Sequence, residues 1–454
     1  MKGDAVLMAC KDEVLLDTLC GKIRGTLLGE AAFFRGIPYA ETPRFQKPTP
    51  IRHWDGVLDA TKQEQDCWQY GAFRNEVQDA DNFYYREFRS ERQFAYGESP
   101  MTLNIIAPRD AANCPVIVFI HGGGHETGTV GELPYGTSTE YAKRGILLVS
   151  VGYRLNVFSL YRSRNFGLHD QLAAVLWVHE FISAFGGDPE RIILMGQSAG
   201  AMSITDLCLN QKLKGIVKGA VLMSGGGAVP GIVGPWTAKQ SAAFWDKVQS
   251  RAGASSEAEM LALPPEQLWN AWYAVSRENR SFHLQQPGID EEIIPDLPQK
   301  VLRRDGELDI PMIFGVTAQD FLPVVLYEMA LSWGLRSSRK GKSPVYGYLF
   351  RRTPPGGDYR AFHAVDLWYL FGNMDKCWRP FGDDDRALSA RMIDYVSAFA
   401  RTGDPNAAGL PQWLPISPAH RDFLCFDVDT EGSLSPAQCR KLVWHTALKD
   451  PGPM

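Results

Sequence analysis

A serine at position 198 stands at the centre of the pentapeptide GQSAG, which spans residues 196–200 and fits the pattern G-x-S-x-G. The pentapeptide follows an apolar run (RIILM) and precedes a stretch of small residues that begins at Ala199. This pattern is typical of a tight turn from a strand into a helix, where glycines avoid collisions and the serine hydroxyl is lifted clear of the sheet. The helix start would also place the Ala199 N–H where the helix dipole favours negative charge. Ser198 is therefore predicted to be a nucleophile, and the alternative is a glycine-rich turn with a capping serine.

A second glycine-rich motif, HGGGH at 121–125, follows directly after the apolar run VIVFI. Three consecutive glycines allow backbone N–H groups to approach a ligand without hindrance and to converge on a developing oxyanion. The alternative is a flexible loop after a strand. Because this motif lies one strand–helix unit before the serine motif, the two together favour attack on a carbonyl group.

A serine hydroxyl is a weak nucleophile, so it needs a base, and the base needs a carboxylate to orient it. On the fold that carries the G-x-S-x-G turn, the acid follows the serine first and the histidine second, each in a loop after a strand. Asp320 follows the apolar run IPMIFGV, and His363 follows the run VYGYLF and a PPGG loop. His283 precedes this acid, while His420 and His445 lack the strand-then-loop setting. The sequence predicts His363 as the base and Asp320 as a candidate acid among many loop carboxylates.

The elements that must position these residues are buried strands alternating with helices. Apolar runs at 116–120, 146–151 and 191–195 predict strands, and residues 168–185 carry apolar side chains at the helical period. Strands that are apolar throughout and alternate with helices indicate a mostly parallel sheet covered on both faces. The predicted fold class is α/β.

Composition and charge exclude several other classes of protein. The chain has 454 residues, 45% of them hydrophobic, and 47 Lys and Arg against 52 Asp and Glu give a net charge of −5. This usage argues against disorder and coiled coils, and the mild acidity argues against a nucleic-acid partner. No stretch reaches the roughly 20 apolar residues of a membrane span, and charged residues interrupt the N-terminus where a secretory signal would be apolar. Eight scattered cysteines without metal-ligand spacing favour a reducing compartment, so we expect a cytoplasmic protein.

Several longer motifs resemble the type-B carboxylesterase (carboxylesterase/cholinesterase) family of the α/β-hydrolase fold. They are FRGIPYA at 34–40, NFGLHDQLAAVLWVHEFISAFGGDPERIILMGQS at 165–198, GVTAQD at 315–320 and AFHAVDL at 361–367. The resemblance runs over most of the chain and implies a single α/β-hydrolase domain over residues 1–454.

The resemblance also implies an activity and roles for particular residues. It implies a serine carboxylesterase that acts on small-molecule esters without a metal or an organic cofactor. In such an enzyme Ser198, Asp320 and His363 would form the catalytic triad. The oxyanion hole would be formed by the backbone N–H groups of Gly123, Gly124 and Ala199.

The chain departs from the family's pattern in three of its motifs. The family's acid is usually a glutamate followed by glycine, whereas this chain has Asp320 followed by Phe321. His125 replaces the aromatic residue that usually follows the glycines. His125 and Phe321 are candidates for lining the pocket, and for His125 the alternative is a packed, hydrogen-bonded ring. Pro100 stands where the family has a cysteine, so Cys67 is expected to be a free thiol.

The stretch between the acid and the histidine is short. Only 43 positions separate Asp320 from His363, and in the family this stretch is usually longer and contributes helices that cover the substrate gorge. A reduced cover buries less of a long acyl chain, so we expect hydrolysis of dissolved esters with short to medium acyl groups. Two other functions stay open: a thioesterase or amidase on the same scaffold, and a catalytically silent interaction protein. The presence of Ser198, His363 and the glycine motif argues against the silent protein.

Overall fold

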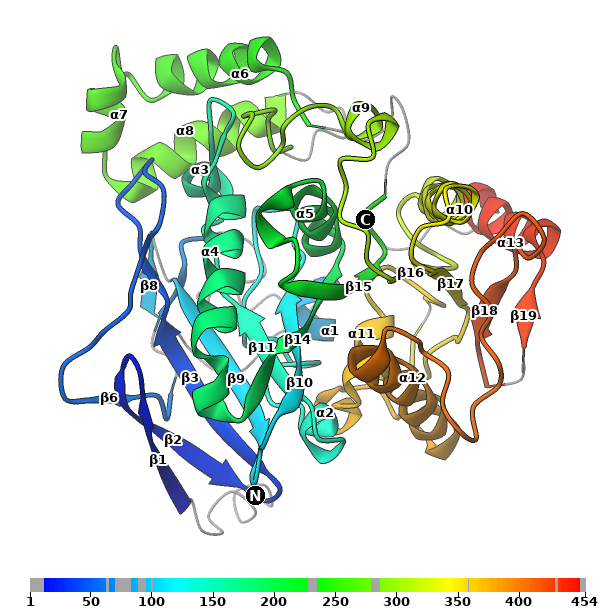
Figure 1. The fold of residues 1–454 in the computed structure, drawn as a ribbon. Helices are drawn as coiled ribbons and strands as arrows, with labels where there is room; N and C mark the ends of the chain where they lie inside the picture. Colours follow the sequence, from blue (N-terminus) through cyan, green and yellow to red (C-terminus); the bar gives the residue numbers. More distant parts are fainter. Residues whose placement is uncertain are drawn as a thin grey trace.

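The computed structural model describes residues 12–62, 65–69, 83–88, 95–98, 101–227, 235–278, 286–357, 359–428 and 432–449. Within these residues the chain forms one large sheet of thirteen strands with helices packed around it (Figure 1). Twelve strands follow one another across the sheet, and β6 (Val57–Asp59) pairs with β2 at the side. In spatial order the twelve are β1 (Asp12–Thr18), β2 (Gly21–Leu28), β3 (Ala31–Pro38), β9 (Thr102–Pro108), β11 (Leu147–Val151), β10 (Cys114–Ile120), β14 (Gly187–Gln197), β15 (Val217–Met223), β16 (Met312–Thr317), β17 (Val345–Phe350), β18 (Phe423–Phe426) and β19 (Ser433–Leu434).

The sheet is parallel in its centre and antiparallel toward the N-terminal edge. The strands from β11 to β18 pair in parallel, whereas those from β1 to β11 pair antiparallel. The α/β class is confirmed, as are the strands expected at 116–120, 146–151 and 191–195. The central part of the sheet is parallel, as expected. The N-terminal strands add an antiparallel part, in which the turns that join β1, β2 and β3 are too short for a helical crossover.

Parallel pairing brings the carboxyl ends of several strands to one edge of the sheet. Ile120, the last residue of β10, is in register with Gly196 near the end of β14. Thr317 and Phe350, the last residues of β16 and β17, are likewise in register. The loops that follow these strands carry every candidate catalytic residue, and this edge is where α/β sheets bind ligands.

Helices cover both faces of the sheet. Gly219 of β15 lies against α12 (Asp383–Thr402), because an added Cβ would meet the Phe399 ring at 3.0 Å. Leu222, three residues further along β15, lies on the side of α5 (Ala199–Cys208). A Cβ on Gly226 would meet both the Leu222 side chain and the side chain of Thr205 on α5. Residues an odd number apart along a strand point to opposite faces, so α5 and α12 cover opposite faces.

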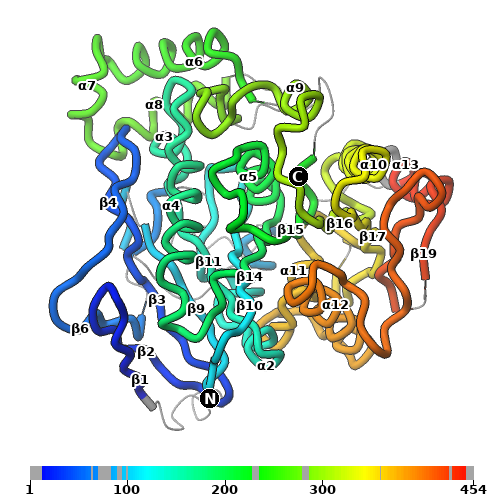
Figure 2. The backbone as a smooth tube through the Cα atoms, viewed as in Figure 1, coloured from blue at the N-terminus to red at the C-terminus, as the bar shows by residue number. Residues whose placement is uncertain are grey.

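Three helices between β15 and β16 form an excursion at one end of the molecule (Figures 1 and 2). This helical excursion comprises α6 (Ala238–Arg251), α7 (Glu257–Ala262) and α8 (Pro265–Glu278). It builds an apolar core of its own, in which Trp245, Leu268 and Trp272 pack with Phe158 and Tyr161. The other α-helices are α1 (Phe83–Phe88), α2 (Glu140–Lys143), α3 (Asn156–Ser159), α4 (Phe166–Phe181), α9 (Pro298–Arg303), α10 (Pro323–Arg339), α11 (Asp366–Phe371) and α13 (Pro436–Lys449).

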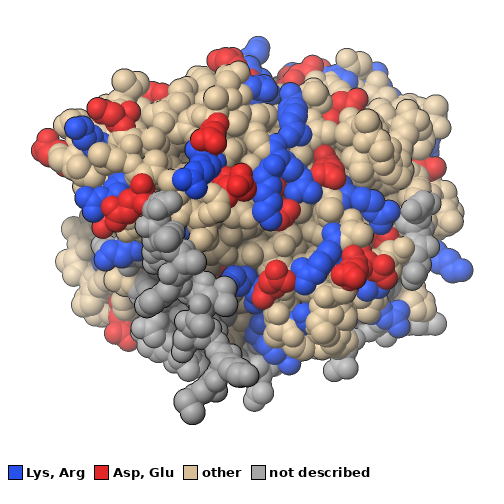
Figure 3. Space-filling view, turned by 90° about the horizontal axis from the view of Figure 1, so that it is seen from below, with Lys and Arg blue, Asp and Glu red and all other residues tan. Residues whose placement is uncertain are grey.

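The surface carries charges of both signs. On the face shown in Figure 3, Lys and Arg lie interspersed with Asp and Glu. Among the described residues, no helix is both long and apolar enough to span a membrane. The same residues contain no group of three or more His, Cys, Asp or Glu that could hold a metal ion.

Candidate active site

Ser198 alone makes the turn between β14 and α5. Its backbone has φ 54° and ψ −123°, a strained conformation for a residue with a side chain. Its N–H donates to the Met223 carbonyl of the neighbouring strand β15 at 2.8 Å. A Cβ on Gly200 would lie 2.1 Å from the carbonyl oxygen of Ile120, so only glycine fits where α5 passes β10. The sharp strand-to-helix turn expected from the motif is therefore present, with Ser198 at its tip.

The glycine loop after β10 lies against this turn. A Cβ on Gly122 would lie 3.0 Å from the Cβ of Ser198, so the loop passes directly beside the serine. Gly123 has φ 104°, and a Cβ there would meet a backbone oxygen of the same loop at 2.1 Å, so the position requires glycine. Gln69 holds the end of the glycine loop at Gly128 with two hydrogen bonds. Its side chain accepts the Gly128 N–H at 2.9 Å and donates to the Gly128 carbonyl at 3.0 Å. These contacts give the loop a defined shape.

Asp320 and His363 meet through a short hydrogen bond. The Nδ1–H of His363 donates to Oδ1 of Asp320 at 2.6 Å, and both side chains are buried. Asp320 also accepts the Phe321 N–H on Oδ1 at 2.9 Å and the Thr317 hydroxyl on Oδ2 at 2.8 Å. Burial opposes ionisation of Asp320, but its interactions with His363 and Thr317 outweigh burial and lower its pKa. An ionised carboxylate only accepts, so the proton lies on Nδ1 and the lone pair of the neutral imidazole lies on Nε2.

The competing histidines lie elsewhere. His420 precedes β18, and His445 belongs to α13, which packs against α10 and β19. His283 lies outside the described residues. The structure thus brings the expected pair of Asp320 and His363 together.

Gln197 makes a contact that sequence reasoning missed. This residue is 4% exposed, and its amide nitrogen Nε2 lies 3.1 Å from Nε2 of His363. Its amide oxygen faces the glycine loop, where a Cβ on Gly122 would lie 2.7 Å from it. The second position of a G-x-S-x-G motif accepts many residue types, so the sequence gives no signal for this contact.

The two candidate pocket residues have different surroundings. Phe321 is 38% exposed, and its ring centre lies 4.3 Å from that of His363, so it is placed to contact a group bound there. His125 is buried with φ 60°, and burial lowers its pKa to about 4. Its Nε2 has no hydrogen-bond partner in the described part of the chain. His125 is therefore a buried ring with an unpartnered Nε2, and its role in lining the pocket stays a prediction.

The short aromatic helix α1 packs against the loop that carries His363. The ring of Phe83 lies 4.8 Å from that of Phe362, the residue before His363. Glu87 anchors α1 through a fully buried ion pair with Arg379 at 2.8 Å. α1 therefore borders the candidate site, and residues 89–94 that follow it lie outside the described residues.

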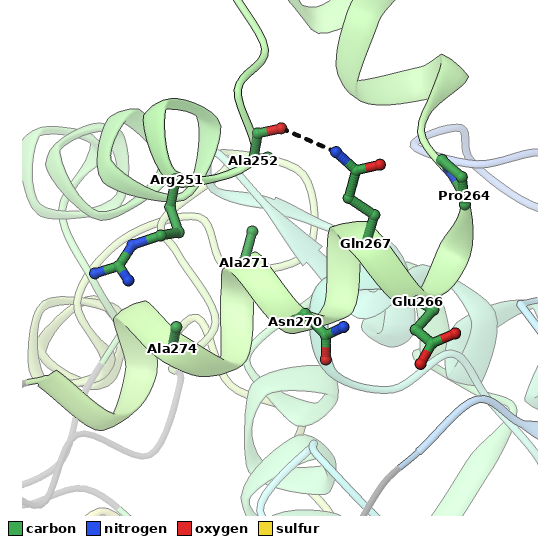
Figure 4. Close-up of a pocket in the computed structure, with 8 residues that line it drawn as sticks. All are labelled: Arg251, Ala252, Pro264, Glu266, Gln267, Asn270, Ala271 and Ala274. Atoms are coloured by element: carbon green, nitrogen blue, oxygen red, sulfur yellow. Dashed lines mark hydrogen bonds between the residues drawn. The ribbon is translucent and has the colours of Figure 1, made fainter.

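A separate depression of about 490 Å³ lies on the helical excursion, between α8 and the end of α6 (Figure 4). The side chain of Gln267 reaches across it to the carbonyl of Ala252 at 3.3 Å. Arg251 at its edge is paired with the exposed Glu278. None of the candidate catalytic residues lines this depression, whose lining is Arg251, Ala252, Pro264, Glu266, Gln267, Asn270, Ala271 and Ala274.

Cys67 is a free and buried thiol. Its Sγ accepts the N–H of Leu155 at 3.3 Å, and burial raises the pKa of the thiol well above its ordinary value. Pro100, on which the expectation of a free thiol was based, lies outside the described residues.

Three comparisons relate this chain to known proteins. The model of the Carboxylesterase family matches residues 12–332 and 324–442. Para-nitrobenzyl esterase of Bacillus subtilis is 29% identical over 91% of this chain and 94% of its own length, and cocaine esterase of Homo sapiens is 25% identical over 93% and 87%. The solved structure of a thermophilic PNB esterase has a TM-score of 0.81 at 25% identity and covers 94% of this chain and 99% of that one. The chain therefore belongs to the carboxylesterase family and is a carboxylic ester hydrolase.

Proposed function

We propose that this esterase works through Ser198 as nucleophile, His363 as general base and Asp320 as the acid that orients the base. The observation that carries this proposal is the 2.6 Å hydrogen bond between Asp320 and His363, both buried in loops beside the strained turn at Ser198. Because Asp320 holds the proton on Nδ1, the basic nitrogen of His363 is Nε2. That nitrogen is the one that contacts Gln197, the residue next to Ser198.

The proposed reaction has two halves that use the same groups. Oγ of Ser198 attacks the ester carbonyl carbon while its proton passes to Nε2 of His363, and the ionised Asp320 stabilises the imidazolium. The carbon–oxygen bond to the alcohol then breaks, and His363 delivers the proton to the departing alcohol. Water attacks the resulting acyl-enzyme in the same way and releases the acid. In both halves the oxyanion accepts hydrogen bonds from the N–H groups of Gly123, Gly124 and Ala199.

We further propose that one α/β-hydrolase domain spans the chain and that it prefers short to medium acyl groups. Within the described residues, the stretch between Asp320 and His363 contains α10 and β17. α10 packs on β16, β17 and α13, so it covers the sheet. α1 borders the loop of His363 through the contact of Phe83 with Phe362. We also propose a cytoplasmic location, which the free state of all described cysteines supports.

A fluorophosphonate probe tests the proposed nucleophile, because it phosphonylates an activated serine. We expect labelling of the unmodified protein at Ser198, and neither labelling nor hydrolysis of an aryl ester by Ser198→Ala. Ser203→Ala is the matched control, since Ser203 is also on α5 but fully buried, and it should label normally. Labelling at another serine, or hydrolysis by pure Ser198→Ala protein, would show that a residue other than Ser198 is the nucleophile.

A series of p-nitrophenyl esters tests the acyl preference. kcat/KM should peak at short to medium acyl chains. Each CH₂ of the acyl chain stabilises binding by about 0.8 kcal/mol only where an apolar wall buries it, and a reduced cover offers little such wall. A steady rise to long chains, or a jump at the micellar threshold, would contradict the preference and leave the nucleophile assignment intact.

A further inference from the structure

We propose that Phe321 selects the alcohol half of the ester, and that the site prefers alcohols that carry an aromatic ring. This preference rests on the proposed function, because it concerns the substrate of the same site. Phe321 directly follows Asp320, the proposed acid. Its side chain therefore supplies an aromatic surface at the end of the acid loop.

The ring of Phe321 lies directly beside the proposed base. Its centre is 4.3 Å from the centre of the His363 imidazole, and the two ring planes are inclined by 34°. Phe321 is 38% exposed and the next residue, Leu322, is 37% exposed, whereas His363 itself is buried. Binding sites are lined mainly by apolar and aromatic side chains around a few polar groups. The two exposed side chains beside the base thus offer a surface that a bound ester can cover.

The proposed reaction determines which half of the ester meets this surface. His363 delivers a proton to the alcohol oxygen, so that oxygen must come within about 2.6–3.2 Å of Nε2. The rest of the alcohol is bonded to the same oxygen and therefore lies beside the imidazole. Because Phe321 packs against the imidazole, its ring is placed to contact the alcohol group.

A second ring extends the aromatic surface. The ring centre of Tyr84 on α1 lies 6.4 Å from that of Phe321, and the two planes are inclined by 50°. α1 is anchored by the buried ion pair of Glu87 with Arg379. The tilted pair of rings therefore has a defined arrangement, with both ring faces and ring edges available for contact.

Contact between rings distinguishes an aromatic alcohol from an aliphatic alcohol of similar size. Aromatic pairs favour offset or edge-to-face arrangements, and these contacts are worth about 2- to 10-fold in an equilibrium constant beyond the area that they bury. The alcohol is still attached when Ser198 attacks, so a contact that persists in this transition state raises kcat/KM. The acyl half does not enter this comparison when two esters share the same acyl group.

Competition between two such esters tests the proposal. Benzyl acetate and cyclohexylmethyl acetate have the same acyl group and similar size, but only benzyl acetate carries an aromatic ring. With equal concentrations in one tube, the initial ratio of benzyl alcohol to cyclohexylmethanol equals the ratio of the two kcat/KM values. This ratio does not depend on the amount of active enzyme. In the unmodified enzyme it should exceed the ratio found in hydroxide hydrolysis by about 2- to 10-fold.

Substitutions at Phe321 separate the ring from the apolar surface. Phe321→Leu removes the ring but keeps an apolar side chain and the backbone N–H that donates to Asp320, and its ratio should fall to about that of hydroxide hydrolysis. Phe321→Tyr keeps the ring and should retain the ratio of the unmodified enzyme. Trp444→Leu is the matched control, because Trp444 is also an exposed aromatic residue but lies on α13, and its ratio should not change.

The outcomes separate this proposal from the proposed function. An unchanged ratio in folded Phe321→Leu would overturn the preference and leave the proposed function intact. A ratio in the unmodified enzyme no higher than in hydroxide hydrolysis would overturn it equally, whether or not the variant folds. If the unmodified protein hydrolyses neither ester and a fluorophosphonate does not label Ser198, the proposed function itself fails.

Discussion

Asp320→Asn removes the charge of the proposed acid and keeps its shape, and the structure predicts how the new amide lies. Oδ1 of Asp320 accepts the backbone N–H of Phe321 at 2.9 Å, a group that can never become an acceptor. Oδ2 accepts the Thr317 hydroxyl at 2.8 Å, which can rotate to accept instead, and the Thr317 N–H only at the long distance of 3.4 Å. The NH₂ group should therefore face Thr317. The amide oxygen then still accepts the Nδ1–H of His363, which keeps its productive tautomer.

The variant loses the attraction between a carboxylate and the imidazolium that forms in the transition state. Two unit charges about 4 Å apart attract by about 4 kcal/mol at an effective dielectric constant of about 20. Since about 1.4 kcal/mol corresponds to a tenfold change in rate, we expect kcat/KM to fall by about 10³-fold. In another triad, the corresponding variant adopts the wrong tautomer and loses about 10⁴-fold in kcat.

Steady-state kinetics on p-nitrophenyl acetate and the ¹⁵N NMR spectrum of the imidazole test these two expectations together. The spectrum of folded Asp320→Asn should show the proton of neutral His363 on Nδ1. A proton on Nε2 would refute the reasoning about Phe321 and Thr317. A fall in kcat/KM of less than tenfold would show that a different carboxylate orients His363.

Two other predictions concern stability. Arg379→Met leaves Glu87 buried without its charge partner, so urea unfolding should show a loss of about 3–5 kcal/mol, and an unchanged midpoint would contradict this. Burial raises the pKa of Asp366 to about 6, so the folded protein binds this proton more tightly than the unfolded chain and loses stability as pH rises from about 4 to about 6. Asp366→Asn should therefore be more stable than the unmodified protein at pH 8, with a difference that vanishes below about pH 4. Stability curves that stay parallel over this range would show that Asp366 does not titrate there.

The central strands could be predicted because each is buried on both faces and therefore apolar throughout. β10 and β17 show this directly, since they are buried along almost their whole length. β1 (DEVLLDT) mixes charged and apolar residues at the edge of the sheet, and its apolar run is too short to indicate a buried strand. The antiparallel N-terminal part was accordingly missed.

The site shows the same division between motif and contact. Ser198 and His363 lie in motifs that the backbone geometry of the turn and the loops requires. Residue types and spacing therefore predict both residues. Gln197 was missed, because its contact with His363 depends on the direction of one side chain across 166 positions of sequence. The pair of Glu87 and Arg379 is 292 positions apart, and neither residue belongs to a recognisable pattern.

The central claim is that Ser198 forms a covalent acyl-enzyme, and rapid-quench mass spectrometry with p-nitrophenyl acetate measures it directly. Acid quenching within the first turnover should trap a protein heavier by one acetyl group, and peptide mapping should place that group on Ser198. His363→Ala should accumulate this species far more slowly at neutral pH, because the serine then has no base. An unmodified Ser198 during rapid turnover, or an acetyl group on another residue, would contradict the account.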